Sequence, residues 1–310
     1  MTPRRLILAT AILPLFGIAG AAAQTFSLEG FGEVKLLKPS QQQSWSDGGL
    51  GKASFDGAGH RSPDLRLNQA IVEGHVQFSE DLTGNATLRL APDQDQPLDL
   101  LDGYVRYRPV STRPWRFSVK LGAFFPPISL ENDEVGWSSP YTITSSAINT
   151  WVGEELRTFG GEVKAEWRFE GGSAEATGGL YGWNQSAGTL LADRGWSFGD
   201  QPTGLAGQLR LPDATAIRQR QQTPLFSDPF AGIRNVPGWY AGLALERAGW
   251  GRVSLLQYDN RADPAVRQHG EVGWRTSFTS IGLQTQFDDL VLIGLAMAGE
   301  TEIRPTATVD

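Results

Sequence analysis

Charged side chains recur at every second position of several short segments, and they are the groups best placed to do chemistry. In one segment Glu162, Lys164, Glu166 and Arg168 alternate with apolar residues. Rings of charged side chains select among ions where they line an aqueous path. The candidates for such a lining are Arg89, Asp102, Arg106, Arg108, Lys120, Glu154, Glu155, Glu162, Lys164, Glu166 and Arg168. Glu73 and Glu175 would face the same way, so ion preference stays open.

The histidines offer little support for an enzyme. His60, His75 and His269 are scattered, and there is no G-x-S-x-G elbow, H-E-x-x-H pair or glycine-rich phosphate loop. His75 alternates with Glu73 and Gln77, which suits the serine-histidine arrangement of an outer-membrane phospholipase. The preferred interpretation is that the three residues belong to the polar lining of an aqueous path. We predict no enzymatic activity and no cofactor.

A metal site is not predicted either. Asp93, Asp95 and Asp99 could offer oxygen ligands to calcium, but they lack the D-x-[DN]-x-[DN]-G spacing. The chain has no cysteine, which excludes thiolate ligands and disulfides. A formal net charge of -7 argues against nucleic acid as a partner.

The N-terminus has the order of a secretory signal. Arg4 and Arg5 precede an uncharged apolar run over 6–20, and three alanines follow at 21–23. The run is about 15 residues long, short of the roughly 20 that a spanning helix needs. We therefore predict a cleaved signal peptide over 1–23 and a mature domain over 24–310.

The spacing of the charged residues also predicts the secondary structure on which they lie. Apolar and polar residues alternate with a period of two, most clearly over 115–121, which is typical of strands. Eleven strands are predicted near 25–36, 65–78, 85–91, 98–109, 115–123, 157–169, 174–183, 238–248, 252–258, 271–287 and 291–299.

The linkers between these strands alternate between long and short without exception. Outer-membrane barrels have tight turns on the periplasmic side and longer loops outside. Aromatic residues border the proposed strand ends, as in an interfacial girdle: Trp115, Trp167, Phe169, Trp183, Trp239, Trp250 and Phe287. The predicted fold is all-β, an antiparallel transmembrane β-barrel located in the bacterial outer membrane.

An odd strand number conflicts with this fold, because single-chain bacterial barrels usually have an even one. A barrel truncated at its C-terminus is the preferred explanation, and a miscounted strand within 184–237 is the alternative. That long region could cap the pore, contact lipopolysaccharide through its arginines or bind a partner, and the sequence does not choose among these roles.

Two neighbouring segments, LDGYVRYR at 101–108 and FSVKLGAFFP at 117–126 with ISLE at 128–131, carry a family resemblance. The pair resembles the phosphate-selective porin O/P family, whose members show a DAY-x-x-Y strand followed by a K-x-G-Q-F-x-x-P-F-S-L-E strand. The resemblance implies a water-filled barrel in which the loop over 124–156 folds inward as a constriction. It does not establish phosphate selectivity. Separately, Glu154 and Glu155 with Arg157 could line a constriction, where loop charges act on passing ions, and a surface ion pair is the equally simple alternative.

The predicted function is a porin through which small solutes or ions diffuse passively. A non-transporting barrel with a structural, surface-binding or lipid-hydrolysing role is the alternative, and a secreted β-sandwich is a third reading. Outer-membrane lipids and lipopolysaccharide are the expected partners. A homotrimer is suggested only by analogy with porins.

Overall fold

A computed structural model describes residues 25–38, 42–50, 63–212, 225–230, 232–233, 235–268 and 271–304. The predicted signal peptide lies outside these residues, as do His60 and His269. With 54% of residues in strands and 7% in helices, the all-β prediction is confirmed.

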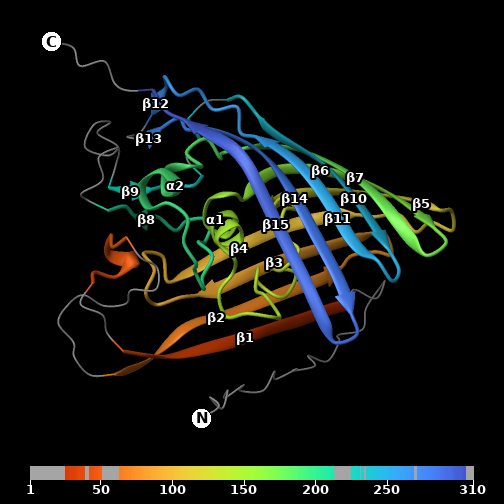
Figure 1. The fold of residues 1–310 in the computed structure, drawn as a ribbon, viewed down its shortest axis with the longest axis horizontal. Coiled ribbons are helices and arrows are strands. Elements are labelled where there is room, and N and C mark those ends of the chain that lie inside the picture. The colour runs from red at the N-terminus through yellow and green to blue at the C-terminus, as the bar shows by residue number, and fades with distance from the viewer. Residues whose placement is uncertain are drawn as a thin grey trace.

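Eleven strands form one antiparallel sheet, and each pairs with its sequence neighbours in that sheet (Figure 1). They are β1 (Thr25–Leu37), β2 (Asp64–Gln77), β3 (Leu82–Leu90), β4 (Leu98–Tyr107), β5 (Trp115–Phe124), β6 (Thr158–Phe169), β7 (Gly172–Gly182), β10 (Gly238–Arg247), β11 (Gly251–Asp259), β14 (Arg275–Phe287) and β15 (Leu290–Glu302). The number and order of the predicted strands are thus confirmed.

Four further strands are only two residues long and form two separate hairpins. β8 (Leu209–Arg210) pairs with β9 (Phe226–Ser227), and β12 (Arg267–Gln268) pairs with β13 (Glu271–Val272). The predicted strand at 271–287 therefore begins only at Arg275. In the described part of 184–237, no strand joins the large sheet, so the idea of a miscounted strand there gains no support.

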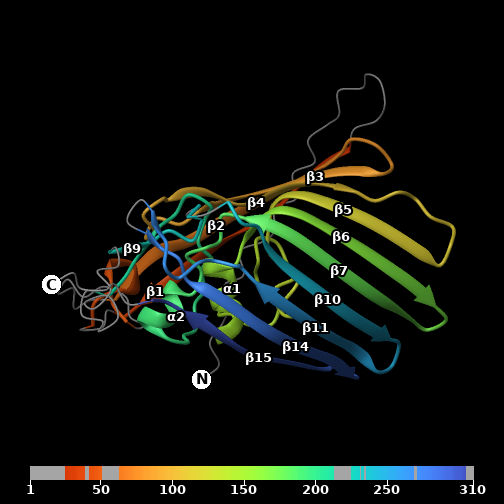
Figure 2. The same cartoon turned by 90° about the horizontal axis from the view of Figure 1, so that it is seen from above.

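The connections differ at the two ends of the sheet, as the linker pattern predicts. The turn between β6 and β7 has two residues, and Gly171 takes a φ of 76°, which suits glycine. Short turns gather at one end, whereas the long connections and the helices gather at the other (Figure 2).

Closure of the sheet is the part of the barrel prediction that the structure does not confirm. β1 pairs only with β2, and β15 pairs only with β14, so both outer edges are open among the described residues. No helix in the described ranges is long and apolar enough to cross a membrane.

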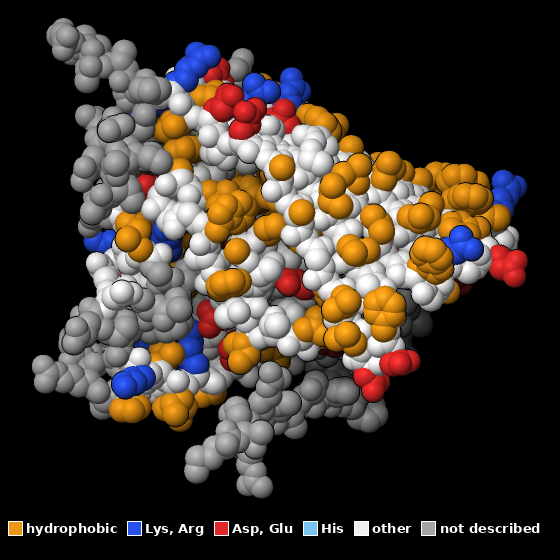
Figure 3. Space-filling model, in the orientation of Figure 1, with side chains coloured by type: hydrophobic (Ala, Val, Ile, Leu, Met, Phe, Trp, Pro, Cys, Tyr) orange, Lys and Arg blue, Asp and Glu red, His pale blue; other side chains and the backbone are white. Residues whose placement is uncertain are grey.

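The outward face of the sheet is apolar and exposed (Figure 3). In β5, Phe117, Val119 and Leu121 are all exposed, and the same alternation recurs in β11 and β14. At the short-turn end, Trp115 stacks with Trp167 at 6.1 Å between ring centroids. Aromatic side chains therefore border the apolar face at this end of the sheet.

The inward face is covered by segments that the sequence pattern did not identify as helical. α1 (Ala147–Glu155) begins at Ser146, whose hydroxyl accepts a hydrogen bond from the Asn149 amide, and α2 (Thr189–Arg194) and a 3₁₀ turn (η1, Trp45–Asp47) lie nearby. Strands surround α1 in both views (Figures 1 and 2). The predicted inward folding of the loop over 124–156 is thus seen.

Candidate pore-lining site

The cross-strand register brings charged residues of four strands onto the inward face. Lys120 lies opposite Arg106 on one side and Glu162 on the other. Glu166 likewise lies between Arg116 and Glu175. These side chains surround a cavity of about 220 Å³, here named the charged cavity. Its charged lining residues are Arg106, Arg108, Arg116, Lys120, Glu162, Lys164, Glu166 and Glu175.

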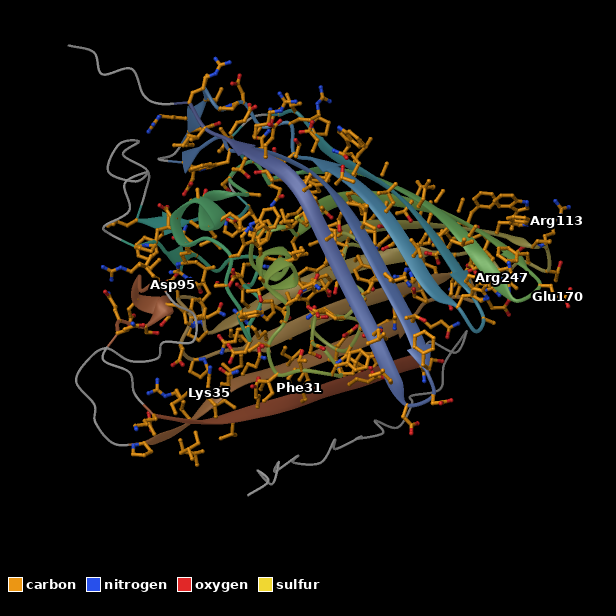
Figure 4. All side chains as sticks on the ribbon, viewed as in Figure 1. Phe31, Lys35, Asp95, Arg113, Glu170 and Arg247 are labelled. Carbon is orange, nitrogen blue, oxygen red and sulfur yellow. The ribbon has the colours of Figure 1, made fainter. Side chains whose placement is uncertain are left out.

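Six of these lining residues are among the predicted pore-lining candidates. Figure 4 labels Arg113, Glu170 and Arg247, which mark the short-turn end of the sheet. The predicted candidate Arg168 does not line the charged cavity, although its Nε lies 3.9 Å from a Glu166 oxygen. The two-residue alternation along the strands therefore predicted that these charged side chains share the inner face of the sheet.

Most carboxylates of the charged cavity have cationic partners. The Lys120 ammonium lies 3.1 Å from Glu162, which also accepts a hydrogen bond of 2.7 Å from the Tyr240 hydroxyl. Glu175 lies between Lys164 at 3.4 Å and Arg252 at 2.8 Å. This network fixes the positions of the charges on the wall.

Two arginines of the charged cavity stand apart from this network. In the described part of the chain, neither Arg106 nor Arg116 makes an ion pair, although the Arg106 guanidinium lies 5.4 Å from the Tyr104 ring centroid. Five of the eight charged lining residues are basic, so the cavity is moderately positive.

The Lys120–Glu162 pair is the least exposed pair of this network, and its loss should be costly. Removing one partner of a buried pair leaves an uncompensated charge, at a cost of about 3–5 kcal/mol. We expect Lys120→Met to lower the free energy of unfolding by the smaller end of that range, measured by urea titration. Lys164→Met is the matched control and should cost less than half as much, because Arg252 still faces Glu175. Equal losses would contradict the pairing.

Other predicted lining residues lie deeper, beneath the inward loops. Arg89 is fully buried and donates to the Pro202 carbonyl. Asp102 accepts hydrogen bonds from Thr87 at 2.7 Å and Asn85 at 3.1 Å. Both residues face inward, but Arg89 holds the segment after α2 against the sheet and does not border open space.

Glu154 and Glu155 also do not border a passage in this structure, because both are buried in α1. The Glu155 carboxylate accepts hydrogen bonds from the Trp151 indole at 2.6 Å and from the Gly188 and Leu190 amides, each at 2.9 Å. Burial, together with repulsion from Glu154, raises the pKa of Glu155 to about 7. This residue therefore fastens α1 to α2.

Arg157 follows α1 and is fully buried. It donates to the carbonyls of Leu101 and Gly153, and its guanidinium lies 4.9 Å from the Phe125 ring centroid. Burial, together with repulsion from Arg89, lowers the pKa of Arg157 to about 9. The residue joins the inward loop to β4.

A row of aromatic side chains crosses the inner face of four strands, β7, β10, β11 and β14. The sequence pattern did not predict this row. Tyr181 stacks with Tyr258 at 5.4 Å, and Tyr258 stacks with Phe278 at 4.8 Å. Tyr240 fits because a Cβ on Gly179 would lie 2.3 Å from its ring. The sequence pattern could have indicated this row, because each of these aromatic residues occupies one of the alternate positions that hold the inward-facing polar residues of its strand.

His75 does not form the nucleophile-base contact of a hydrolase in this structure. Its Nε2 lies 3.2 Å from Glu73, and among the described residues no hydrogen bond joins it to Ser27, its register partner on β1. In the same residues, no group of three or more acidic or histidine side chains could hold a metal ion.

Comparison with known proteins identifies no relative: no family model, no curated protein and no solved structure matches the chain. The resemblance to phosphate-selective porins therefore stays a prediction from its two motifs.

Proposed function

We propose that the chain forms most of the wall of a passive pore in the bacterial outer membrane, which it reaches through the predicted signal peptide. The observation that carries the proposal is the division of the sheet into an exposed apolar outer face and a charged inner face. Lipid favours the first and water the second. A water-soluble sandwich would bury its apolar face against a second layer, and the described residues provide none.

A pore of this kind requires a closed sheet, because unpaired backbone groups are costly in lipid. β1 and β15 are separated by ten antiparallel steps, so they run in the same direction. A direct pair between them would be parallel. The proposal therefore includes an odd number of additional strands that join the two edges in antiparallel pairing.

The inward loop would set the width of the pore. Trp151 of α1 packs against Phe278 of β14 at 5.6 Å between ring centroids. The charged cavity lies between this packing contact and the short-turn end of the sheet. Solutes that pass the inward loop would therefore also pass the side chains of the charged cavity.

Conductance of the full-length protein in planar lipid bilayers tests the proposal. Stepwise currents that vanish without protein are expected. A folded, inserted protein that never conducts would instead favour a non-transporting barrel. That second candidate rests on the aromatic cluster between α1 and the sheet, which fills much of the inner space.

A charge on the outer face should interfere with lipid contact. Leu121 lies near the middle of β5 and is 60% exposed. We expect Leu121→Arg to destabilise the protein in lipid vesicles by about 2–4 kcal/mol, measured by urea unfolding. Thr112→Arg, in the exposed turn before the same strand, should change stability by less than about 1 kcal/mol. Equal effects of both substitutions would contradict lipid contact at Leu121.

A further inference from the structure

A second and larger cavity of about 540 Å³ lies between β1 and the inward loop, here named the β1 cavity. Small-molecule sites commonly have volumes of about 300–1,000 Å³. The β1 cavity shares no lining residue with the charged cavity. Figure 4 labels Phe31, one of its lining residues, and Lys35 on the same edge strand. It is therefore a separate candidate binding site.

The electrostatics of the β1 cavity disfavour anions. Among the described residues, no lysine, arginine or histidine lines it, whereas Glu33 and Asp200 do. Glu33 accepts a hydrogen bond of 3.0 Å from the Gln69 amide, and Asp200 lies 2.9 Å from the Lys35 ammonium. Both carboxylates are thus held in place, and their negative charge repels an anionic ligand.

Two buried acceptors in the lining lack hydrogen-bond partners. Gln69 is 4% exposed and Asn149 is 2% exposed, and the side-chain carbonyl oxygen of each has no partner among the described residues. An unsatisfied buried polar atom costs about 1–3 kcal/mol. Neither oxygen is reachable from the cavity as the side chains stand, so the charged acceptors that a ligand meets are the Glu33 and Asp200 carboxylates. A ligand with O–H or N–H groups can donate to these carboxylates, and a fully ionised oxyanion cannot.

The remaining lining is rich in hydroxyl groups and aromatic surface. The hydroxyl side chains are Ser138, Ser139, Thr142, Ser145 and Thr150. Trp137 and Tyr141 add aromatic rings, and Tyr141 is 45% exposed. One face of the Trp137 ring is covered by Phe125, at 4.2 Å between centroids, which fixes its orientation. Such a surface suits a ligand with polar edges and apolar C–H faces.

We propose that the β1 cavity binds a neutral polyhydroxylated solute of the size of a mono- or disaccharide. Its hydroxyls would donate to the Glu33 and Asp200 carboxylates and exchange hydrogen bonds with the lining hydroxyls, while a ring face packs against Tyr141. An ammonium ligand could donate to the same acceptors but could not accept from hydroxyls. The binding site does not depend on whether the chain conducts.

Calorimetric titration of the full-length protein tests this assignment. The protein is held in an amine-oxide detergent, because sugar-based detergents would compete. Glucose or maltose should bind saturably with a Kd on the order of 1 mM or tighter. Inorganic phosphate and putrescine should give no saturable heat. Absence of saturable binding by either sugar, or tighter binding of phosphate or putrescine, would overturn the proposal.

Variants locate the binding. Tyr141→Ala should weaken sugar binding at least tenfold while the melting temperature stays unchanged, because the side chain is exposed. Phe198→Ala is the matched control, since Phe198 is 63% exposed and does not line the cavity. Unchanged affinity in Tyr141→Ala, or an equal loss in both variants, would place any bound sugar elsewhere.

Discussion

Replacing Glu155 with alanine is expected to lower the free energy of unfolding by roughly 3–5 kcal/mol and to increase channel conductance. The carboxylate satisfies the Trp151 indole and two amides at the start of α2, and each buried donor left without a partner costs about 1–3 kcal/mol. Ser227 of β9 lies 3.4 Å away on the same carboxylate. Loss of this contact would release α1 from α2 and widen the space beside the sheet.

Urea unfolding followed by tryptophan fluorescence measures the first effect, and single-channel recording measures the second. Glu134→Ala is the control, because Glu134 is an exposed acid of the same inward loop. If the two variants were equally stable, Glu155 would not be the fastening group.

The same residue should make stability depend on pH. Burial raises the pKa of Glu155 from 4.5 to about 7, so the folded protein favours the protonated form of this side chain more than the unfolded protein does. The resulting stabilisation is complete below about pH 4.5 and is lost as pH rises through 7. Glu154 and Arg194 carry the neighbouring charges, and burial raises the pKa of Glu271 to about 8. Stability of Glu155→Gln should therefore change less between pH 5 and pH 8 than stability of the natural protein, with the remainder due to Glu271.

Removal of the Arg157 side chain has the second-largest expected effect. Arg157 is a buried cation on which the carboxylates of Asp99, Asp102 and Glu154 all act electrostatically. We expect Arg157→Ala to lower the free energy of unfolding by about 3–5 kcal/mol, because those charges lose their compensation. Part of the loss should be offset, since repulsion with Arg89 also ends.

The substitution Arg157→Lys distinguishes the contribution of the positive charge to stability from the contribution of the guanidinium's shape and hydrogen bonds. A lysine keeps the charge but cannot bond the Leu101 and Gly153 carbonyls together or stack on Phe125 in the same way, so about half of the loss should remain. Arg113→Ala, in an exposed short turn, should be neutral. A loss below about 1 kcal/mol in Arg157→Ala would show that the cation is not needed to hold the loop.

The strands were predictable from sequence because their signal is local. In 115–121 each apolar residue faces outward and each polar one inward, so the period alone identifies both the strand and its faces. The alternation of linker lengths then gave the antiparallel order. Sheet closure was not predictable in this way, since pairing of the outer edges depends on contacts that no periodicity reports.

The site was predicted only where it lies on strands. Lys120, Glu162 and Lys164 line the charged cavity because strand parity places them there. Glu154 and Glu155 lie on α1, whose burial depends on long-range packing, so their sequence neighbours could not show whether they face water or protein. The β1 cavity was missed for the same reason, because it joins β1 to residues more than a hundred positions away.

The open edges of β1 and β15 also bear on handling of the protein outside a membrane. Each edge strand has 13 residues, and among the described residues the amide and carbonyl groups on its outer side pair with no other strand. Such edges are templates for pairing with other chains, and the apolar outer face would add to the attraction. We expect the polypeptide to aggregate in water through edge-to-edge association, so its synthesis in a cell would require a holding chaperone until the edges are paired.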